Sequence, residues 1–320
     1  MYDFTELETN KPRSALAKTV LASAAVLAGT AVLSQVLANQ AEKNNPPKGK
    51  FIEVDGVRLH YVEQGSGEPI VFIHGNGSMI EDLASSGLLS MAAQNGRAIA
   101  FDRPGFGHTD RPSGRSWGPE EQAALLVKAF AALKIDRPVI VAHSWGTLVA
   151  LALALNHPNS VARLVLLSGY YFASLRSDTV MSAPGATPVL GDIFQHTVGP
   201  LIARLTASSV IEHMFEPRPV NPAFKAGYPV GLASRPSQLK AVATDTLTMP
   251  FNAFGLSRRY HELKLPVAIF AGENDKIVDS AAQSGKLHEA IPHSSYHCEK
   301  NTGHMIHHAI PAAIIAAALD

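Results

Sequence analysis

The chain has 320 residues, of which 46% are hydrophobic and 17% are charged, and its 27 basic residues equal its 27 acidic residues. This neutral balance offers no basic excess for a nucleic-acid backbone, and the length suits one α/β domain with an insertion. The single cysteine, Cys298, excludes an intramolecular disulfide and a cysteine-based metal site. Because Cys298 stands in a strand-like run, we expect a small buried side chain there. No glycine-rich phosphate loop is present, so neither a cofactor nor a metal is expected.

The first 50 residues form a separate segment ahead of the domain. After Lys11, Arg13 and Lys18, residues 19–41 carry no charge and consist largely of alanine, valine and leucine, and a polar linker follows. This run is long enough to cross a bilayer. Three interpretations stay open: a retained membrane anchor, a signal peptide of an exported protein cleaved near Ala38, and a helical arm of a soluble protein. The length favours the anchor, because it exceeds the usual apolar core of a signal peptide.

Strand and helix patterns alternate from Phe51 onward. Residues 51–62 alternate about Asp55-Gly56, which predicts an antiparallel hairpin. The following segments are a strand at 69–73, a helix near 80–93, a strand at 97–101, a helix at 119–133, a strand at 138–142, a helix at 145–157 and a strand at 162–167. Such alternation predicts an α/β fold with a mostly parallel sheet and helices on both faces. We expect this core over residues 51–168 and 266–320.

Residues 169–265 break this rhythm. The segment is rich in proline and contains short amphipathic stretches, so we expect a helical cap over the strand ends, where ligands of open α/β sheets bind. Its apolar side chains favour an apolar ligand, but none is assigned to a pocket, because aromatic residues in a cap also form its own small core. They are Phe172, Met181, Phe194, Met214, Phe215, Phe224, Tyr228 and Phe251.

The run from Val139 to Ala150 carries the most specific signal in the chain. A buried strand leads into Ser144 and then directly into a helix. This is the pattern of a nucleophile elbow, a strained turn that exposes a serine hydroxyl to a neighbouring base. Gly146 leaves room for the turn, whereas Ala142 replaces the usual first glycine of G-x-S-x-G and adds one methyl group. On the motif alone, Ser144 could also be a simple helix cap.

Three further segments follow the order that acyl-transfer chemistry requires. The strand at 69–73 leads into His74-Gly75-Asn76-Gly77, where the backbone N–H of Asn76, with that of Trp145, could cradle an oxyanion. A second buried run, 266–271, is followed by Gly272-Glu273-Asn274-Asp275, which places the carboxylate of Asp275 just past a strand end. His304 lies on a loop ahead of the closing helix. The chain order is therefore serine, aspartate, histidine.

In this order and in these motifs, the sequence from about Phe51 to the C-terminus resembles the α/β-hydrolases. The resemblance implies Ser144 as the nucleophile, His304 as the general base and acid, and Asp275 as the group that orients the imidazole. It also implies backbone oxyanion donors at Asn76 and Trp145. The segment 101–112 is similar to the D-R-P-G-x-G-x-S turn of these enzymes, in which Asp102 and Arg103 are interpreted as structural residues.

Other acids and histidines compete for these roles. Asp279 stands where a helix should begin and is more simply a cap residue. His307 and His308 are expected on the final helix at partly exposed positions. His143 is expected on the other side of the elbow from the nucleophile, as a hydrogen-bonded packing residue.

The sequence His143-Ser144-Trp145-Gly146 is also similar to the H-D-W-G motif of epoxide hydrolases and haloalkane dehalogenases, and Ser-Trp-Gly occurs in proline iminopeptidases. An aspartate nucleophile displaces a group at saturated carbon, whereas a serine needs an acyl carbonyl and an oxyanion hole. The resemblance therefore implies a serine esterase acting on a carboxylic ester with an apolar portion. A proline iminopeptidase-like peptidase or amidase is the alternative, and a ligand-binding module without activity is the alternative from a different class.

Overall fold

The computed structural model of the chain describes residues 11–174, 187 and 189–320, and its side chains from Leu16 onward. Met181 lies outside the described residues. Eight strands form one sheet in the order β1-β2-β4-β3-β5-β6-β7-β8. Strand β2 is antiparallel to β1 and β4, and the neighbouring pairs from β4 to β8 are parallel. The strands are β1 Lys50–Val54, β2 Val57–Gly65, β3 Pro69–Ile73, β4 Arg97–Phe101, β5 Val139–His143, β6 Arg163–Leu167, β7 Val267–Gly272 and β8 Ser295–Glu299.

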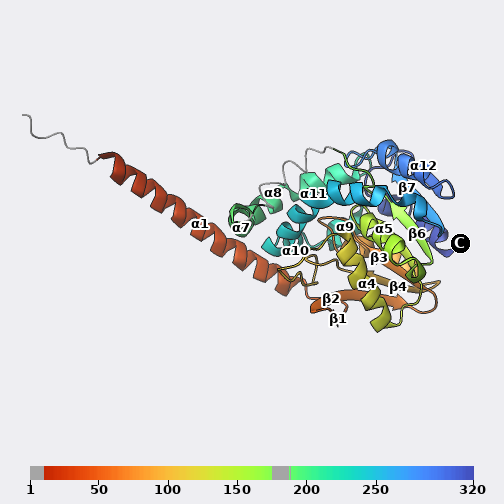
Figure 1. The fold of residues 1–320 in the computed structure, drawn as a ribbon. Coiled ribbons are helices and arrows are strands. Elements are labelled where there is room, and N and C mark those ends of the chain that lie inside the picture. Colours follow the sequence, from red (N-terminus) through yellow and green to blue (C-terminus); the bar gives the residue numbers. More distant parts are fainter. Residues whose placement is uncertain (1–10, 175–186, 188) are drawn as a thin grey trace, which may run out of the picture.

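Helices cover both faces of this sheet, because the central strands are apolar on both sides (Figure 1). Helices α4 (Pro119–Leu133), α5 (Gly146–Asn156) and α11 (Pro236–Ser257) contribute to one buried cluster. Helices α2 (Ile80–Ser85), α3 (Leu88–Ala92) and α14 (Pro311–Leu319) contribute to the other. The predicted α/β fold with a mostly parallel sheet is confirmed.

Two local predictions are wrong. The single helix near 80–93 is divided into α2 and α3, because Gly87 adopts a left-handed conformation with φ 87° and begins a new helix. Cys298 is exposed instead of buried. It lies on β8, which is the edge strand of the sheet and has only β7 as a neighbour. A strand-like run at the edge of a sheet need not be buried, because fewer elements cover an edge strand than a central one.

Among the described residues between β6 and β7 are five α-helices, which we call the cap helices. They gather at one end of the molecule (Figure 1). They are α7 Leu190–His196, α8 Gly199–Phe215, α9 Pro222–Gly227, α10 Val230–Ala233 and α11. Two short helices, α12 (Lys286–Ala290) and α13 (Ile306–Ala309), complete the C-terminal part.

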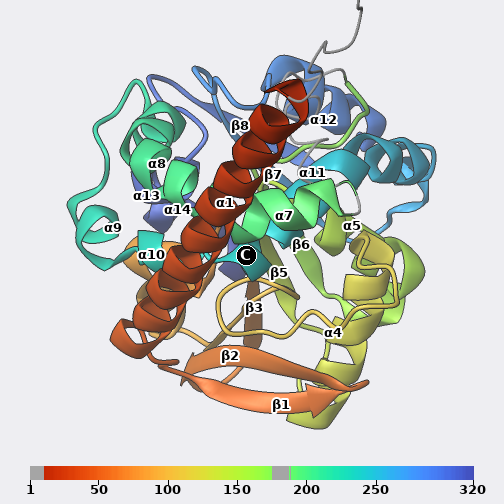
Figure 2. The ribbon, with the colours of Figure 1, turned by 90° about the vertical axis from the view of Figure 1, so that its left-hand side faces the viewer.

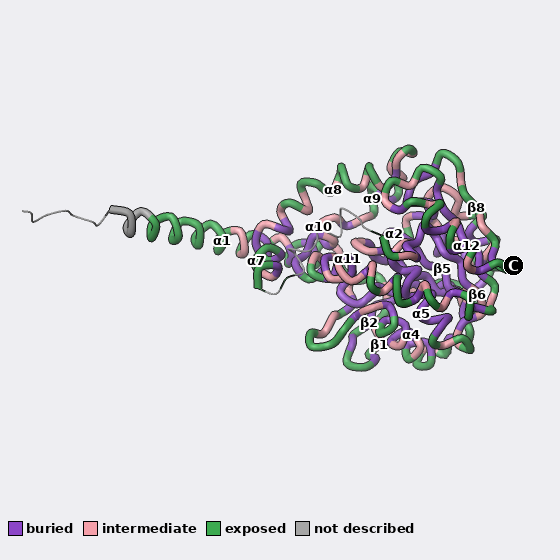
Figure 3. The backbone as a smooth tube through the Cα atoms, turned by 45° about the horizontal axis from the view of Figure 1, so that its top comes forward, coloured by how far each residue is buried: buried purple, intermediate pink, exposed green. Residues whose placement is uncertain are grey.

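Helix α1 (Lys11–Asn44) projects from the molecule and crosses the cap helices (Figures 1 and 2). Its C-terminal part packs on the cap through the buried residues Ser34, Ala38 and Ala41, whose spacing puts them on one helix face. Ser34 Oγ donates to the backbone oxygen of Thr197 at 2.5 Å. Residues 16–29 are exposed all round (Figure 3). Among the described residues, one helix is long and apolar enough, by length and composition, to cross a bilayer. It is the segment Leu16–Asn44, with mean hydropathy 1.9.

Candidate active site

Ser144 occupies the turn between β5 and α5 in a strained conformation. Its φ is 52°, in the left-handed region that a residue with a Cβ rarely adopts. A Cβ on Gly146 would lie 2.7 Å from the carbonyl oxygen of Ile73, so only glycine allows β3 and α5 to approach here. Ala142 is fully buried in β5, paired in register with Ile73 and Leu166, and its methyl group is accommodated in the sheet core. The local geometry is that of a nucleophile elbow.

A chain of hydrogen bonds joins Ser144, His304 and Asp275. Ser144 Oγ lies 2.9 Å from His304 Nε2, and His304 Nδ1 lies 2.7 Å from Asp275 Oδ2. The side chains of His304 and Asp275 are only 3% and 2% exposed. The second oxygen of Asp275 accepts the backbone N–H groups of Ile277 and Val278 at 2.8 and 2.9 Å. The carboxylate is thereby held in place, and it fixes the imidazole with Nε2 toward the serine.

The alternative acid and one alternative base have structural roles. Asp279 is exposed, and its Oδ1 accepts the backbone N–H of Ala282 at 2.8 Å, at the start of a short π-helical turn, Ala281–Gly285. His143 is buried, and its Nε2 donates to the backbone oxygen of His304 at 3.1 Å. Burial, together with the neighbouring His307, holds the pKa of His143 well below its usual range, so this ring is neutral. Asp279 is a cap residue and His143 a hydrogen-bonded packing residue, as expected, but His143 borders the cavity that contains Ser144 instead of lying on the other side of the elbow.

The expectation for His307 and His308 is wrong. Both lie on α13 and not on the final helix, and their side chains are 0% and 3% exposed. They converge on Asp82, whose Oδ1 lies 2.9 Å from His307 Nε2 and 2.8 Å from His308 Nε2. Ser78 Oγ donates to the other carboxylate oxygen at 2.8 Å. Burial opposes the charge on Asp82, but the two histidines hold its pKa well below the usual range. Nothing in the sequence around Asp82 signalled this cluster.

The same cluster contains the residues best placed to hold a metal ion. Among the described residues, Asp82, His143 and His307 can each offer one ligand atom, with all three atoms within 4.8 Å of one another. The three side chains are buried, and each already makes a hydrogen bond within the protein. We assign no metal to them.

Asn76 and Trp145 border the cavity that contains Ser144. Their side chains point to α11 and are held there: Asn76 Nδ2 donates to Thr246 Oγ1 at 2.8 Å, and Trp145 Nε1 donates to the backbone oxygen of Asp245 at 3.1 Å. Helix α11 therefore positions the two residues whose backbone N–H groups the sequence analysis expects to bind an oxyanion. Asp245, whose backbone oxygen holds the Trp145 side chain, was not identified from the sequence.

Asp102 and Arg103 hold the turn after β4, as the resemblance implies. Asp102 accepts the backbone N–H groups of Ile80 and His108 at 2.9 and 3.0 Å, and it lies 2.7 Å from His60 Nδ1. The Arg103 guanidinium lies 4.3 Å from the centre of the Trp145 ring. Arg103 thus packs against Trp145, the residue after Ser144, but does not itself border the cavity.

The cavity above Ser144 has a volume of about 770 Å³. Its walls come from the loop after β3, the elbow, the loop after β7 and the cap helices α8, α9 and α11. Many of its lining side chains are apolar: Tyr170, Ala207, Val210, Ile211, Met214, Phe224, Val230, Val242, Met249, Ile277, Val278 and Met305. Such a cavity suits a small apolar ligand, held against the polar group formed by Ser144 and His304.

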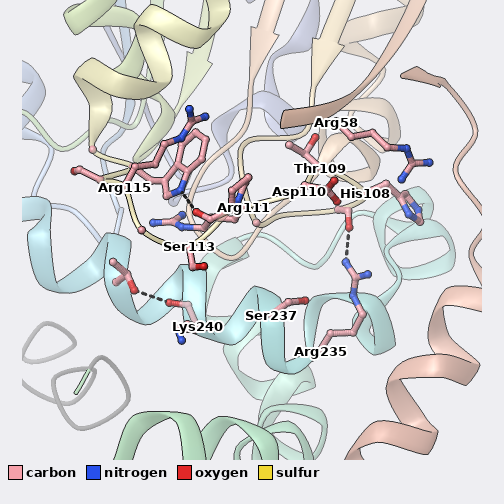
Figure 4. Close-up of a pocket in the computed structure, with 18 of the residues that line it drawn as sticks. Arg58, His108, Thr109, Asp110, Arg111, Ser113, Arg115, Arg235, Ser237 and Lys240 are labelled. Atoms are coloured by element: carbon pink, nitrogen blue, oxygen red, sulfur yellow. Dashed lines mark hydrogen bonds between the residues drawn. The ribbon is translucent and has the colours of Figure 1, made fainter. Parts of the chain in front are cut away.

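A second cavity, of about 870 Å³, lies between the turn after β4 and α11 (Figure 4). It is polar and contains neither Ser144 nor His304. Its charges are partly paired: Arg235 binds Glu42 at 2.7 Å, and Arg111 binds Asp245 at 2.9 Å. This polar cavity is the larger of the two, but Ser144 and His304, the residues arranged for acyl transfer, border the other cavity.

Comparison with known proteins assigns the family. The profile of the alpha/beta hydrolase fold family matches residues 68–309. The 2-hydroxymuconate semialdehyde hydrolase of Pseudomonas putida is 28% identical over 84% of this chain and 92% of that protein. The enzyme of the same name from Pseudomonas sp. strain CF600 is 29% identical over 65% of this chain and 78% of its own length. The chain belongs to the alpha/beta hydrolase fold family and is a hydrolase.

Solved structures confirm the fold. The crystal structure of wild-type Cfl2 from Burkholderia cenocepacia superposes with a TM-score of 0.69 at 24% sequence identity. The match covers 83% of this chain and 92% of that one. At this identity the likeness concerns the fold alone.

Proposed function

We propose that this protein is a serine hydrolase that cleaves an acyl bond through an acyl-enzyme. Ser144 Oγ attacks the carbonyl carbon while His304 Nε2 takes its proton, and Asp275 stabilises the imidazolium that forms. The backbone N–H groups of Asn76 and Trp145 bind the oxyanion of the tetrahedral intermediate. His304 then gives the proton to the leaving alcohol, and water, activated by the same histidine, releases the acid. The observation that carries this proposal is the pair of hydrogen bonds from Ser144 to His304 and from His304 to Asp275.

The substrate we propose is a carboxylic ester with an apolar portion. The lining of the cavity supports this choice, because its cap side contributes mainly apolar side chains. Lys276 is the one lysine or arginine among the described residues that border it, and it binds Glu216 at 2.6 Å. An anionic substrate would therefore find no free lysine or arginine there. This disfavours a dicarboxylate of the kind that the names of some relatives describe, such as the 2-hydroxy-6-oxononadienedioate hydrolase of Pseudomonas putida.

The peptidase alternative finds less support in the cavity. A free N-terminal amine needs a carboxylate to bind it. Asp82 borders the cavity, but Ser78, His307 and His308 already surround its oxygens. An amine would have to displace these partners, whereas an ester makes no such demand. A ligand-binding module without activity would not require the strained Ser144 or the buried Asp275.

A panel of substrates tests this proposal. The purified protein is offered p-nitrophenyl butyrate, proline anilide, an epoxide, a haloalkane and a 2-hydroxy-6-oxo-dienoate. We expect turnover of the ester and a loss on the order of 10⁴-fold in Ser144→Ala. Ser90→Ala, an exposed serine on α3, is the matched control and should act like the wild type. Preference for proline anilide would replace the esterase by the peptidase, and epoxide turnover that depends on Ser144 would contradict the acyl mechanism.

We further propose a three-part organisation: a membrane anchor with its linker in residues 1–50, a catalytic core in 51–168 and 266–320, and a cap in 169–265. The burial of Ser34, Ala38 and Ala41 against the cap favours an anchor that is retained, because cleavage after Ala38 would leave only Ala41 of these three. The full-length protein should pellet with membranes, resist a high-salt wash and require detergent. Recovery of the intact chain in the soluble fraction would favour the helical arm instead.

A further inference from the structure

The packing of α1 on the cap helices determines how far a bilayer that α1 spans must extend along the cap. The uncharged run of residues 19–41 is about 35 Å long at 1.5 Å per residue, close to the roughly 30 Å of a hydrocarbon core. Only residues 19–29 of this run project clear of the cap, since Thr30 and Ala31 are the first to be partly covered. That free part is about 16 Å long, half of what a span needs. A spanning α1 therefore carries the cap helices beside it into the membrane.

The contacts between α1 and the cap determine which cap helices would enter the bilayer together with α1. Ser34 Oγ binds the backbone oxygen of Thr197, which ends α7, and Arg204 Nη2 of α8 donates to the backbone oxygen of Leu37 at 3.2 Å. Ser34 and Leu37 both lie within the uncharged run. Val32 and Val36, at the same level but on the side of α1 away from the cap, are 65% and 55% exposed. Water would meet these valines, whereas acyl chains would cover them.

Helices α7 and α8 present apolar side chains to the outside at this level. We call this set the apolar cap face; its members and exposed fractions are Leu190 72%, Ile193 45%, Phe194 43%, Ile202 48% and Leu205 84%. From Gly199 to Ile211, α8 carries a single charged residue, Arg204, whose guanidinium is turned to α1 and α10. This is a large apolar exposure for two short stretches of a monomer, and the exposed charge on α7, Asp192, is paired with Lys240 at 2.6 Å.

Charged groups gather just beyond the apolar cap face, where lipid headgroups would lie. The polar cavity borders the C-terminal end of α1 at Glu42 and includes Arg58 and Arg115 (Figure 4). Lys43 follows directly in the chain. Along α1, the change from apolar to charged residues thus falls where the helix reaches the polar cavity.

We propose that the apolar cap face is a second membrane-binding element, which inserts with α1 into the same lipid bilayer. This inference rests on the proposed anchor. In this arrangement one wall of the cavity faces the membrane. Helix α8 carries Leu205 on its outer surface and contributes Ala207, Ile211 and Met214 to the wall of the cavity above Ser144. An apolar ester dissolved in the bilayer would meet the enzyme at this helix.

Depth-dependent fluorescence quenching on the full-length protein tests the proposal. In a Cys298→Ser background, single cysteines at Val26, Leu205 or Leu319 carry an environment-sensitive dye, and the protein is reconstituted in phosphatidylcholine vesicles with nitroxide lipids. Leu319, 46% exposed on α14, is the matched control, because it is next to the C-terminus, which lies at the end of the molecule opposite to α1 (Figure 1). We expect comparable strong quenching at positions 26 and 205 and none at 319.

The other outcomes separate the two proposals. Quenching at 26 alone would overturn insertion of the cap while leaving the anchor. Absence of quenching at all three positions would overturn both. A functional comparison adds a second readout: Leu205→Glu should raise KM for a long-chain ester in vesicles and leave hydrolysis of a soluble short ester unchanged, whereas Leu319→Glu should change neither. If the wild type hydrolyses no ester, the proposed reaction fails, but the quenching result still decides the docking of the cap.

Discussion

Arg103 and Asp245 form a buried ion pair that joins the core to the cap, with Nη1 and Oδ2 at 2.8 Å and side chains 3% and 1% exposed. Arg103 follows β4, and Asp245 lies on α11, more than a hundred residues later. Burial lowers the pKa of Arg103 to about 10, against the opposing effect of Asp245, so the guanidinium stays charged at neutral pH. Through Trp145, which binds the backbone of Asp245, the pair also reaches the elbow.

Removal of Asp245 should therefore destabilise the protein strongly. Asp245→Ala leaves the buried Arg103 without its counter-charge, which should lower the free energy of unfolding by about 3–5 kcal/mol. Asp192→Ala is the matched control on the cap, since its pair with Lys240 is exposed, and it should cost less than about 1 kcal/mol. Urea unfolding of both variants measures the difference. Equal midpoints for the two variants would show that the buried pair contributes little.

The acid assignment separates Asp275 from Asp279. Asp275→Asn keeps the shape but removes the charge that stabilises the imidazolium of His304, so kcat on a p-nitrophenyl ester should fall by about 10⁴-fold. Asp279→Asn should leave kcat within about twofold, because Asp279 is an exposed helix cap worth about 1 kcal/mol of stability. If the Asp279 variant were the inactive one, the assignment of the acid would have to be reversed.

His307 should matter for stability and not for the chemical step. In His307→Ala the buried carboxylate of Asp82 loses one of its partners, and we expect a loss of about 2–4 kcal/mol in the free energy of unfolding. Because His307 does not touch Ser144, kcat per folded molecule should remain near that of the wild type. The same substitution at the exposed His261 is the control. A large fall in kcat with unchanged stability would place His307 in the catalytic machinery.

Stability should fall as the pH drops below about 6.5. Burial and the neighbouring Arg103 lower the pKa of His74 to about 4, and burial lowers those of His143 and His307. These histidines take up protons on unfolding, so the loss begins near their unfolded pKa of about 6.5 and grows as the pH falls toward the folded values. His74 alone contributes on the order of 3 kcal/mol over its window. Asp82, whose folded pKa is depressed, adds a loss below about pH 4, where its carboxyl takes up a proton in the unfolded chain but not yet in the folded one.

Urea unfolding between pH 8 and 4 measures this dependence. In the folded protein, His74 Nε2 accepts the backbone N–H of Arg103 at 2.9 Å, a bond that the protonated ring cannot accept. His74→Gln should therefore show a shallower slope between pH 6.5 and 4 than the wild type. A stability that stays constant or rises over this range would contradict the buried neutral state of these histidines.

Sequence patterns located the elements whose signals are local. The strands Pro69–Ile73 and Arg97–Phe101 and the helix Pro119–Leu133 have the predicted bounds. Each is an apolar or amphipathic run set off by proline, glycine or polar residues, and these signals do not depend on distant partners. Ser144, Asp275 and His304 were each predicted just after a strand, and in the parallel part of the sheet the C-terminal ends of β5, β7 and β8 lie on the same side.

Features that depend on distant pairing were not predictable. Asp82 and His307 are 225 positions apart in the chain, and only the fold makes their burial favourable. Cys298 was expected to be buried because it stands in a strand-like run, but its exposure is decided by the place of β8 at the sheet edge. The division of α2 from α3 depends on the backbone conformation of Gly87. The sequence did not indicate this conformation, because the residues on both sides of Gly87 have a pattern compatible with one continuous helix.

Covalent labelling tests the central claim most directly. The full-length protein is treated with a fluorophosphonate, digested, and mapped by mass spectrometry, with His304→Ala in parallel. A serine activated by His304 should react, because the base removes its proton as the phosphorus is attacked. We expect a single adduct on the peptide that contains Ser144, and its loss in the His304 variant. An ester-hydrolysing wild-type protein that carries no adduct at Ser144, or carries it on another residue, would contradict the assignment of Ser144 as the nucleophile.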